Sequence, residues 1–447
     1  MEADCLCGPF ICFTLTSTYD DSVPAHIGLC PHIAAPRRQE WTPEMTSDIY
    51  IIDACRTPMG KLGGQLAHVR PDDLAGHVIA ALLQRQTDLD PLAIEDVYWG
   101  AANQAGEDNR NVARMAVLLA GLPIEVPGAT VNRLCGSGMQ AVISGAHALA
   151  GGWGDVVITG GSESMTRSPY VVLKGNRPFP TGFPAAADTV LGWRLVNPRM
   201  EDLYPPITLG MTAEVVADKY DISREDQDRF ALRSHQSALA ALEAGRFDAE
   251  IEPIEAPTDA RHRSMVTISS DEGPRADTSM EILGRLPSVF KDEGTVTAGN
   301  SSPMNDGAAA LILATEAGIA EHTLRPMARI VASAAAGVYP DVMGIGPVPA
   351  SEKALARAGL TVGDLDLVEL NEAFAAQSVA CMRLLDLDPD KVNVNGGAIA
   401  IGHPLGASGA RILTTLVHEL KRRNGRYGLA TMCIGVGQGI STVIERV

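Results

Sequence analysis

The sequence is poor in aromatic side chains and contains no long apolar run. Aromatic residues make up only 4% of the 447 residues, whereas glycine occurs 44 times. This composition is typical of an α/β enzyme, in which many tight turns join strands to helices. Because a helix needs roughly 20 consecutive apolar residues to span a bilayer, the sequence predicts no membrane segment and no membrane partner.

Positive charge is also scarce. The formal net charge is −18 at pH 7, which argues against nucleic acid or an anionic membrane as the main partner, because both are negatively charged. The net charge leaves open a local basic pocket for a phosphorylated ligand.

The eight cysteines form no paired CxxC motif. A structural zinc site usually has such closely spaced ligands, so the sequence predicts no metal. Four cysteines lie within the first 30 residues, outside any periodic pattern, and the other four are widely spaced. This distribution favours a reduced, cytoplasmic protein.

Residues 1–47 are predicted to be a poorly ordered N-terminal extension. The segment is irregular and dotted with proline, without a helix or strand period. Its arginines, Arg37 and Arg38, are outnumbered by acidic residues, unlike those of a mitochondrial transit peptide. Met45 directly precedes the first strand-like run and is a candidate for the physiological start.

From residue 49 onward, apolar strand patterns and helix patterns alternate. We expect strands at residues 49–54, 96–100 and 155–160, and helices at residues 71–86, 111–119 and 139–150. This alternation predicts an α/β protein with a mainly parallel sheet that is covered by helices on both faces.

The alternation stops between residues 167 and 287, which we interpret as an inserted loop domain that covers the active face. Its clearest element is a helix that begins at Ser223, with a capping-box pattern through Asp226, and ends at Gly245. Strands are expected again at residues 294–300 and 307–314.

The last third of the chain repeats the order of the first. We expect strands at residues 328–336, 366–370, 391–395 and 428–432, and helices at residues 351–358 and 407–422. In this alignment His403 takes the place of Cys135, each just before a glycine-rich helix start. We therefore predict two duplicated βαβ-type halves, residues 48–166 with 288–322 and residues 323–447.

Cys135 lies at a predicted junction between a strand and the helix at residues 139–150. Unpaired backbone N–H groups and the helix dipole would favour the thiolate there, which is the nucleophilic form. Gly136 and Gly138 would leave room for an acyl group. The alternative is a buried structural cysteine, the usual state of an isolated Cys-Gly pair.

Three further polar residues follow strands of the C-terminal half: Asn371, His403 and Cys433. Because ligands of open α/β sheets bind beyond the carboxyl ends of strands, we expect these residues to converge with Cys135. Taken singly, each has a structural alternative: a helix N-cap for Asn371, a core histidine for His403 and a buried apolar thiol for Cys433.

Several motifs together resemble the thiolase family, from about residue 49 to the C-terminus. In chain order they are Arg133-Leu134-Cys135-Gly136-Ser137-Gly138, Gly160-Gly161-Ser162-Glu163-Ser164-Met165, Thr297-Ala298-Gly299-Asn300-Ser301-Ser302, Asn305-Asp306-Gly307-Ala308, Asn371-Glu372-Ala373-Phe374-Ala375, residues 396–409 and residues 433–439. The resemblance implies the layered α-β-α-β-α thiolase fold. It also implies that CoA cleaves a 3-oxoacyl-CoA, or that two acyl-CoAs condense in the reverse direction.

The resemblance also implies a catalytic role for each of five residues. Cys135 would carry the acyl group as a thioester, His403 would be the base that activates it, and Cys433 would move the proton at the α-carbon. Asn371 would position a water in the enolate oxyanion site, and the backbone N–H groups of Gly435 and Cys135 would form a second oxyanion site.

Residues that bind CoA and its acyl esters are likewise implied by the resemblance. They are Ser302, Phe290, Met343, Phe374 and Met165. CoA is then a substrate, and no cofactor is required. Because the family usually assembles as a dimer of dimers, a homo-oligomer, either dimer or tetramer, is expected.

The substrate is indicated by three further segments. Residues 102–110, 192–198 and 422–427 are most similar to β-ketoadipyl-CoA thiolases, which split 3-oxoadipyl-CoA into succinyl-CoA and acetyl-CoA. A terminal carboxylate needs a nearby cation, for which Arg167 and Lys174 are the candidates. The alternatives are an acetoacetyl-CoA thiolase and a general β-oxidation 3-ketoacyl-CoA thiolase.

Two other protein classes share the expected fold. A decarboxylating condensing enzyme usually has a second histidine or an asparagine at the position of Cys433. A non-catalytic acyl-CoA-binding protein with a thiolase fold would be expected to lack a catalytic residue, whereas every such position is occupied here. Both observations favour a catalytic thiolase.

Overall fold

The computed structural model describes residues 48–175, 177–179 and 181–447. The predicted extension at residues 1–47 lies outside these ranges. Residues Met45–Val447 form one compact unit, and the description below concerns this unit alone.

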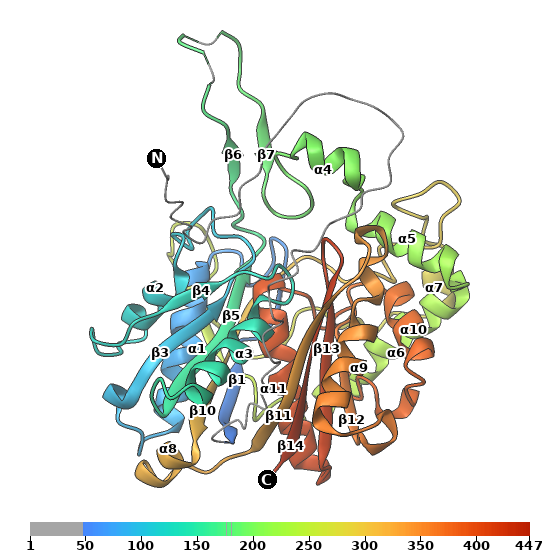
Figure 1. Ribbon diagram of the computed structural model, residues 1–447. Helices are drawn as coiled ribbons and strands as arrows, with labels where there is room; N and C mark the ends of the chain where they lie inside the picture. The colour runs from blue at the N-terminus through green and yellow to red at the C-terminus, as the bar shows by residue number, and fades with distance from the viewer. Residues whose placement is uncertain (1–47, 176, 180) are drawn as a thin grey trace, which may run out of the picture. The chain divides into compact units, whose positions relative to one another are not determined.

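A ten-stranded mixed sheet, built from two similar halves, runs through the described chain (Figure 1). In spatial order, the first half contains β1 (Ile49–Arg56), β10 (Asn305–Thr315), β5 (Val156–Ser164), β3 (Ile94–Gly100) and β4 (Ala129–Val131), with β2 (Gly60–Lys61) beside β10. The second half contains β11 (Ala328–Gly337), β14 (Gln438–Arg446), β13 (Tyr427–Ile434) and β12 (Leu367–Leu370).

The two halves meet where β1 pairs antiparallel with β11, through Tyr50 with Arg329 and Ile51 with Ala328. Outward from this seam, each half has two antiparallel pairings and then a parallel one. In the first half these are β1–β10, β10–β5 and β5–β3, and in the second β11–β14, β14–β13 and β13–β12. The predicted duplication is therefore present in the strand order itself.

The prediction of a mainly parallel sheet is wrong. Among the described strands, parallel pairing is confined to β3–β4, β3–β5 and β12–β13. Alternating strands and helices indicate the parallel crossovers correctly. However, β14 follows β13 after a turn at residues 435–437, which is too short for a crossover and imposes an antiparallel hairpin.

Two segments that were expected to be strands are not. In the segment at residues 294–300, the N–H groups of Thr295 and Val296 donate to the Glu214 carboxylate instead of to a neighbouring strand. At residues 391–395, pairing is reduced to one parallel bridge between Val368 and Val392. That bridge occupies the position in the second half that β4 occupies in the first.

Six helices arrange the sheet into the expected α-β-α-β-α layers (Figure 1). The first half is covered on its outer face by α1 (Pro71–Arg85) and α2 (Val112–Leu119), and the second half by α9 (Pro347–Ala358) and α10 (Ala375–Leu384). Between the halves lie α3 (Ser137–Ala150) and α11 (Leu405–Arg423). One apolar core lies under the outer helices of each half, and a third core, shared by the two half-sheets, surrounds α3 and α11.

The region predicted to be an inserted loop domain contains short elements around one long helix. They are β6 (Tyr170–Val172), β7 (Ala186–Asp188), α4 (Pro198–Leu203), α5 (Leu209–Lys219), α6 (Arg224–Glu243), β8 (Ile254–Pro257), β9 (Met265–Ile268) and α7 (Met280–Gly284). Helix α6 begins as predicted, since the Ser223 side chain accepts a hydrogen bond from the Asp226 N–H. The boundaries of this region as a separate domain stay a prediction.

The remaining elements are short. They comprise α8 (Glu316–Glu321) and the 3₁₀ segments Pro91–Ala93, Pro340–Ile345, Val362–Asp364 and Pro389–Lys391. Among the helices of the described ranges, none has the length and apolar character needed to cross a bilayer.

Candidate active site

The two central helices, α3 and α11, meet with their backbones almost in contact at their N-terminal turns. A Cβ atom added at Gly138 would lie 2.7 Å from the Gly406 carbonyl oxygen, and one added at Gly409 would lie 2.3 Å from the Met139 nitrogen. Glycine is therefore required at this crossing. The crossing brings together the loops that precede the two helices, and these loops carry Cys135 and His403.

The loop before α3 has a strained backbone that is held by local hydrogen bonds. Leu134 has a positive φ of 47°, a conformation that L-residues adopt infrequently. The Ser137 hydroxyl donates to the Leu134 carbonyl at 2.6 Å and accepts from the Arg133 N–H at 2.9 Å. These bonds hold Cys135 at a fixed position in front of the helix, buried but lining a cavity.

Gly136 and Gly138 do not provide the expected space for an acyl group. A Cβ at Gly136 would meet the Ile434 side chain at 2.5 Å, and the space beside Gly138 is filled by α11. Both glycines therefore serve packing within the protein, and the sequence-based interpretation of this motif is wrong.

His403 is buried and its imidazole is oriented by Ser408. The Nδ1 atom of His403 lies 2.6 Å from Ser408 Oγ, whose proton is donated to the Pro404 carbonyl at 2.9 Å. Ser408 therefore accepts from an Nδ1–H group, which leaves Nε2 as an unprotonated acceptor. Burial, and then the charge of Arg411, lower the pKa of His403 to about 3, so the ring is neutral near pH 7.

Asn371 follows β12 and lies against the His403 ring. Its Nδ2 atom is 3.4 Å from Nε2 and 3.5 Å from Nδ1 of His403. Its Oδ1 atom has no hydrogen-bond partner among the described residues. The alternative role as a helix N-cap is wrong, because α10 begins at Ala375 and Phe374 occupies the N-cap position.

The two cysteines of this region are thiols at rest. Burial raises the pKa of Cys135 to about 11, although backbone N–H groups of Gly435 and of Cys135 itself act in the opposite direction. Burial and the neighbouring Cys135 also raise the pKa of Cys433. Backbone N–H groups thus favour the thiolate, as expected, but desolvation outweighs them and leaves Cys135 a thiol.

A cavity of about 630 Å³ is lined by four of the five predicted catalytic residues, Cys135, His403, Cys433 and Gly435. Asn371 is not among the lining residues but adjoins the cavity through His403. All five predicted substrate-binding residues line the same cavity, namely Ser302, Phe290, Met343, Phe374 and Met165. The structure thus brings together residues from both halves and from the segment at residues 288–304.

One wall of the larger cavity is aromatic and packs in the same apolar cluster as Cys433. The rings of Phe290 and Phe374 pack edge to face, with centroids 6.3 Å apart. The Ser302 N–H donates to the Ala373 carbonyl at 3.0 Å. This bond joins the loop that carries Ser302 to the loop that carries Phe374.

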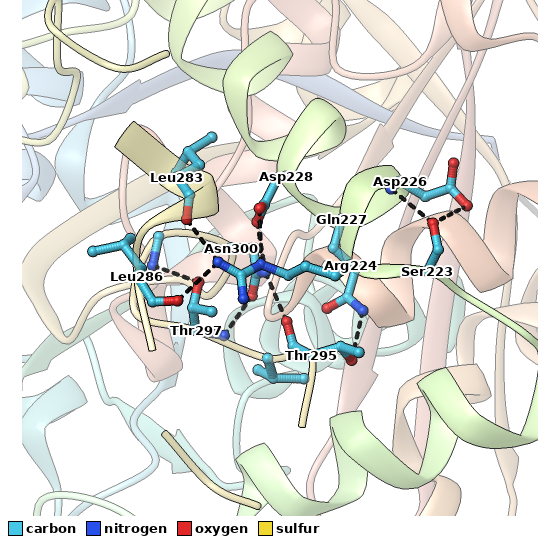
Figure 2. Close-up of polar contacts among 12 residues, drawn as sticks. Ser223, Arg224, Asp226, Gln227, Asp228, Leu283, Leu286, Thr295, Thr297 and Asn300 are labelled. Atoms are coloured by element: carbon cyan, nitrogen blue, oxygen red, sulfur yellow. Dashed lines mark hydrogen bonds and ion pairs between the residues drawn. The ribbon is translucent and has the colours of Figure 1, made fainter. Parts of the chain in front are cut away.

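A polar network ties the segment before Ser301 to helix α6 (Figure 2). Asn300 Nδ2 donates to Asp228 at 2.9 Å, and its Oδ1 accepts from the Thr297 N–H at 2.8 Å. Arg224 donates to the same Asp228 at 2.8 Å and to the carbonyls of Leu283 and Leu286, which precede the segment. Because the buried polar groups of Asn300 and Asp228 are hydrogen-bonded to each other and to their neighbours, the network can rigidify this wall of the cavity.

A second cavity, of about 260 Å³, also reaches Cys135 and Gly435. Arg194 is the one charged residue among the described residues that line it. The candidate cations Arg167 and Lys174 line neither cavity. The Arg167 guanidinium is instead paired with Glu107.

Sequence reasoning missed several residues of this region. Ser408 and Arg194 were not assigned any role, although Arg194 lies in a segment that carried a family likeness. Lys61 and Arg275, which line the larger cavity, were not noticed either. Cationic side chains that lie far apart in the sequence give no periodic signal, and only their convergence on a cavity identifies them.

Comparison with known families agrees with this geometry. Residues 49–317 match the family described as "Thiolase, N-terminal domain", and residues 324–446 match "Thiolase, C-terminal domain". Within the described ranges, no group of three or more His, Cys, Asp or Glu side chains could hold a metal ion.

Curated relatives align over nearly their whole length. The "Beta-ketoadipyl-CoA thiolase" of Pseudomonas aeruginosa is 52% identical over 405 residues, which is 90% of this chain and 100% of the relative. The "3-oxoadipyl-CoA/3-oxo-5,6-dehydrosuberyl-CoA thiolase" of Escherichia coli is 52% identical over 403 residues, again 90% and 100%.

Solved structures show the same fold. An acetyl-CoA acetyltransferase from Bacillus anthracis superposes with a TM-score of 0.84 at 42% identity, over 90% of this chain and 99% of that one. Human mitochondrial 3-ketoacyl-CoA thiolase in complex with CoA gives a TM-score of 0.83 at 42% identity, with the same coverage of each chain.

Proposed function

This chain belongs to the thiolase family of acyltransferases, and from that premise we propose that it cleaves 3-oxoadipyl-CoA with CoA to give succinyl-CoA and acetyl-CoA. The observation that carries the proposal is the convergence of Cys135, His403 and Cys433 on one cavity. The names of its relatives in Pseudomonas aeruginosa and Escherichia coli support the choice of substrate.

The reaction begins with attack of the Cys135 sulfur on the 3-oxo carbon. His403 accepts the thiol proton at Nε2, the nitrogen that Ser408 leaves free. Because Cys135 is a thiol and His403 is neutral, proton transfer accompanies the formation of the carbon–sulfur bond. The bond between C2 and C3 then breaks.

Cleavage leaves a succinyl thioester on Cys135 and the enolate of acetyl-CoA. Cys433 donates its thiol proton to the α-carbon of that enolate, and its buried, high-pKa thiol suits a proton donor to a basic carbanion. A second CoA then gives its thiol proton to the Cys433 thiolate and attacks the thioester. Succinyl-CoA is released as the Cys135 sulfur leaves, and Cys135 takes back its proton from His403.

Two sites stabilise the negative oxygens that develop. The backbone N–H of Gly435 and that of Cys135 both point to the Cys135 sulfur region, where the oxygen of the tetrahedral intermediate would lie. The enolate oxygen would lie near Asn371 and His403, with a water held by the unpaired Asn371 Oδ1. The CoA arm would occupy the larger cavity beside Ser302, Phe290, Met343, Phe374 and Met165, as a substrate in a reaction that needs no cofactor.

The test is CoA-dependent loss of the enolate absorbance of three substrates: 3-oxoadipyl-CoA, acetoacetyl-CoA and 3-oxooctanoyl-CoA. We expect a clear preference for 3-oxoadipyl-CoA in kcat/KM. Cys135→Ala should abolish turnover, whereas Cys381→Ala, which removes a buried thiol from another apolar core, should retain it.

A preference for either unbranched monocarboxylate would replace the proposal with an acetoacetyl-CoA thiolase or a general β-oxidation thiolase. Binding of acyl-CoA without turnover of any substrate would indicate a non-catalytic thiolase-fold protein.

We also propose that the enzyme is a cytoplasmic homo-oligomer, either a dimer or a tetramer. Strand β4 lies at the free end of the sheet order, and Leu118, Leu119 and Ile124 near it in the chain are exposed. An exposed strand edge with apolar neighbours is typical of an interface. Two catalytic thiols require a reducing compartment. Light scattering that gave a monomer mass would overturn the first part.

A further inference from the structure

We propose that Arg194 binds the terminal carboxylate of the acyl group carried on Cys135, and that it therefore selects dicarboxylic 3-oxoacyl-CoA substrates. This inference rests on the proposed thiolase reaction and extends it to a specificity-determining residue in the smaller of the two cavities that meet at Cys135.

The division of the substrate between the two cavities follows from the chemistry. The covalent intermediate joins the Cys135 sulfur to C3, so C4, C5 and the C6 carboxylate remain attached to the enzyme while C1, C2 and CoA depart. The larger cavity contains the residues proposed for CoA. The acyl remainder is therefore left with the smaller cavity, which opens on the same sulfur.

The lining of the smaller cavity matches a short chain with a charged end. Leu134, Leu209 and Leu405 supply apolar surface near Cys135 for the two methylenes. Arg194 is the charged residue of this lining, within the described parts of the chain. An apolar cavity with one cation would accept a succinyl thioester better than a fatty acyl thioester of the same length. The methyl end of a fatty acyl chain would leave the cation without a partner.

The guanidinium of Arg194 has donors to spare. Among the described residues, the guanidinium makes one hydrogen bond, which Nη1 donates to the Thr189 carbonyl at 2.8 Å, and no carboxylate pairs with it. Since a guanidinium has five N–H donors in a planar fork, the others remain for a ligand carboxylate. Arg167, by contrast, already forms two bonds with the Glu107 carboxylate.

The loop that carries Arg194 is held in place on both sides. Asn103 Nδ2 donates to the carbonyl of Thr189 at 3.2 Å and to its hydroxyl at 2.9 Å, and that hydroxyl donates to the Pro169 carbonyl at 2.6 Å. Trp193 Nε1 donates to the Ile207 carbonyl at 3.2 Å. These contacts place the cation before the substrate arrives, which reduces the entropy lost on binding.

The experiment compares two substrates of equal length, 3-oxoadipyl-CoA and 3-oxohexanoyl-CoA, which differ in whether the chain ends in a carboxylate or a methyl group. For Arg194→Met we expect kcat/KM for 3-oxoadipyl-CoA to fall about 10- to 100-fold, the range for a charged hydrogen bond. Turnover of 3-oxohexanoyl-CoA should stay constant or rise, which also shows that the variant is folded.

Two matched variants complete the design. Arg167→Met removes the cation favoured by the sequence, and Arg199→Met removes an exposed arginine of α4. Both should keep the wild-type ratio of the two substrates, because neither residue lines a cavity that reaches Cys135.

The possible results separate the two proposals. Wild-type enzyme that turns over both substrates equally well would refute the proposed substrate. Wild-type preference for 3-oxoadipyl-CoA that survives in Arg194→Met would leave the proposed function intact and overturn the role of Arg194. A preference lost in Arg167→Met instead would assign the carboxylate to that residue.

Discussion

Cys135 and His403 form an uncharged pair, with the proton on sulfur, because both lie in a buried and poorly solvated place. Desolvation raises the pKa of Cys135 to about 11 and lowers that of His403 to about 3. Burial acts in the same sense on both, since in each it disfavours the charged form. The consequence is that neither group titrates between pH 5 and 9.

The reactivity of Cys135 should therefore rise with pH over the whole accessible range. Alkylation by iodoacetamide requires the thiolate, whose fraction grows about tenfold per pH unit below the pKa. We expect the rate at Cys135, followed by peptide mass spectrometry between pH 6 and 9, to increase without a plateau. A plateau beginning below pH 8 would show that the thiolate is stabilised after all.

Ser408 sets which imidazole nitrogen of His403 is free, so its removal should reduce turnover more than binding. Ser408→Ala removes the acceptor of Nδ1–H and lets the ring adopt the unproductive tautomer. We expect kcat to fall about 10-fold or more with little change in KM for CoA.

The control for Ser408→Ala is Thr414→Val. Thr414 lies in the same helix, and its hydroxyl, like that of Ser408, donates to a carbonyl four residues earlier, that of Ala410. Thr414→Val should leave kcat unchanged. If both variants lose the same activity, the effect belongs to helix α11 and not to the tautomer.

At this scale the sequence identified the reacting residues but not their electrostatic state. Cys135, His403, Cys433 and Gly435 converge on one cavity, as predicted. The thiol state of Cys135 did not follow from the sequence, because a local pattern shows the helix terminus but not the depth of burial. The role of Ser408 depends on the direction of one hydroxyl proton, which no spacing reveals.

At the scale of elements, helix α6 has the function of bracing the cavity wall formed by residues 288–304. The link is Asn300, which binds Asp228 of α6 and, in its own segment, the backbone of Thr295 and Thr297 (Figure 2). Asn300 and Asp228 are both buried. Loss of Asn300 would thus leave unpaired polar groups inside the protein.

Asn300→Ala should weaken both stability and CoA binding. Each buried group left without a partner costs about 1–3 kcal/mol, so we expect a lower midpoint of unfolding in urea. Ser301 and Ser302 follow Asn300 directly, so we also expect KM for CoA to rise several-fold at 20 °C. The value of kcat should change less, because His403 and Ser408 are not part of this network. A raised KM would be absent if the wall were independent of this network.

The helices were predictable from sequence to within a few residues, whereas strand directions were not. Helix α6 is signalled by its N-cap residue, Ser223. Helix α11 is signalled by a long apolar stripe and by its C-cap residue, Asn424, whose φ is 58°. Direction and pairing of strands depend on partners far away in the chain. The segment at residues 294–300 has strand-like composition, but the Glu214 carboxylate takes its N–H groups.

At the scale of the whole molecule, the helix layer between the two half-sheets contains buried charge, which pairs within the second half. Arg411 of α11 is fully buried and lies 3.6 Å from Glu369 of β12. None of its three guanidinium nitrogens has a hydrogen-bond partner among the described residues. Burial raises the pKa of Glu369 to about 8. This direction is expected when a carboxylate is removed from water and its ion pair does not fully compensate for the lost hydration.

Arg411→Met tests this balance. Removing one partner of a buried pair costs about 3–5 kcal/mol, and we expect the lower end because the raised pKa of Glu369 lets it take up a proton near pH 7. The double variant Arg411→Met/Glu369→Gln should recover most of the loss in urea unfolding, since neither position then leaves a charge without its partner. Additive losses in the two single variants would show that the residues do not interact.

The same substitution should also reach the active site, because Arg411 is the charge that lowers the pKa of His403 after burial itself. Without that charge the pKa of His403 rises, so protonation of the ring begins at a higher pH and removes the base at the acid end. We expect the acid limb of kcat/KM to shift upward in Arg411→Met and to stay shifted in the double variant, since Glu369→Gln restores stability but not the cation. An acid limb that returned to its original place in the double variant would instead trace the shift to lost stability.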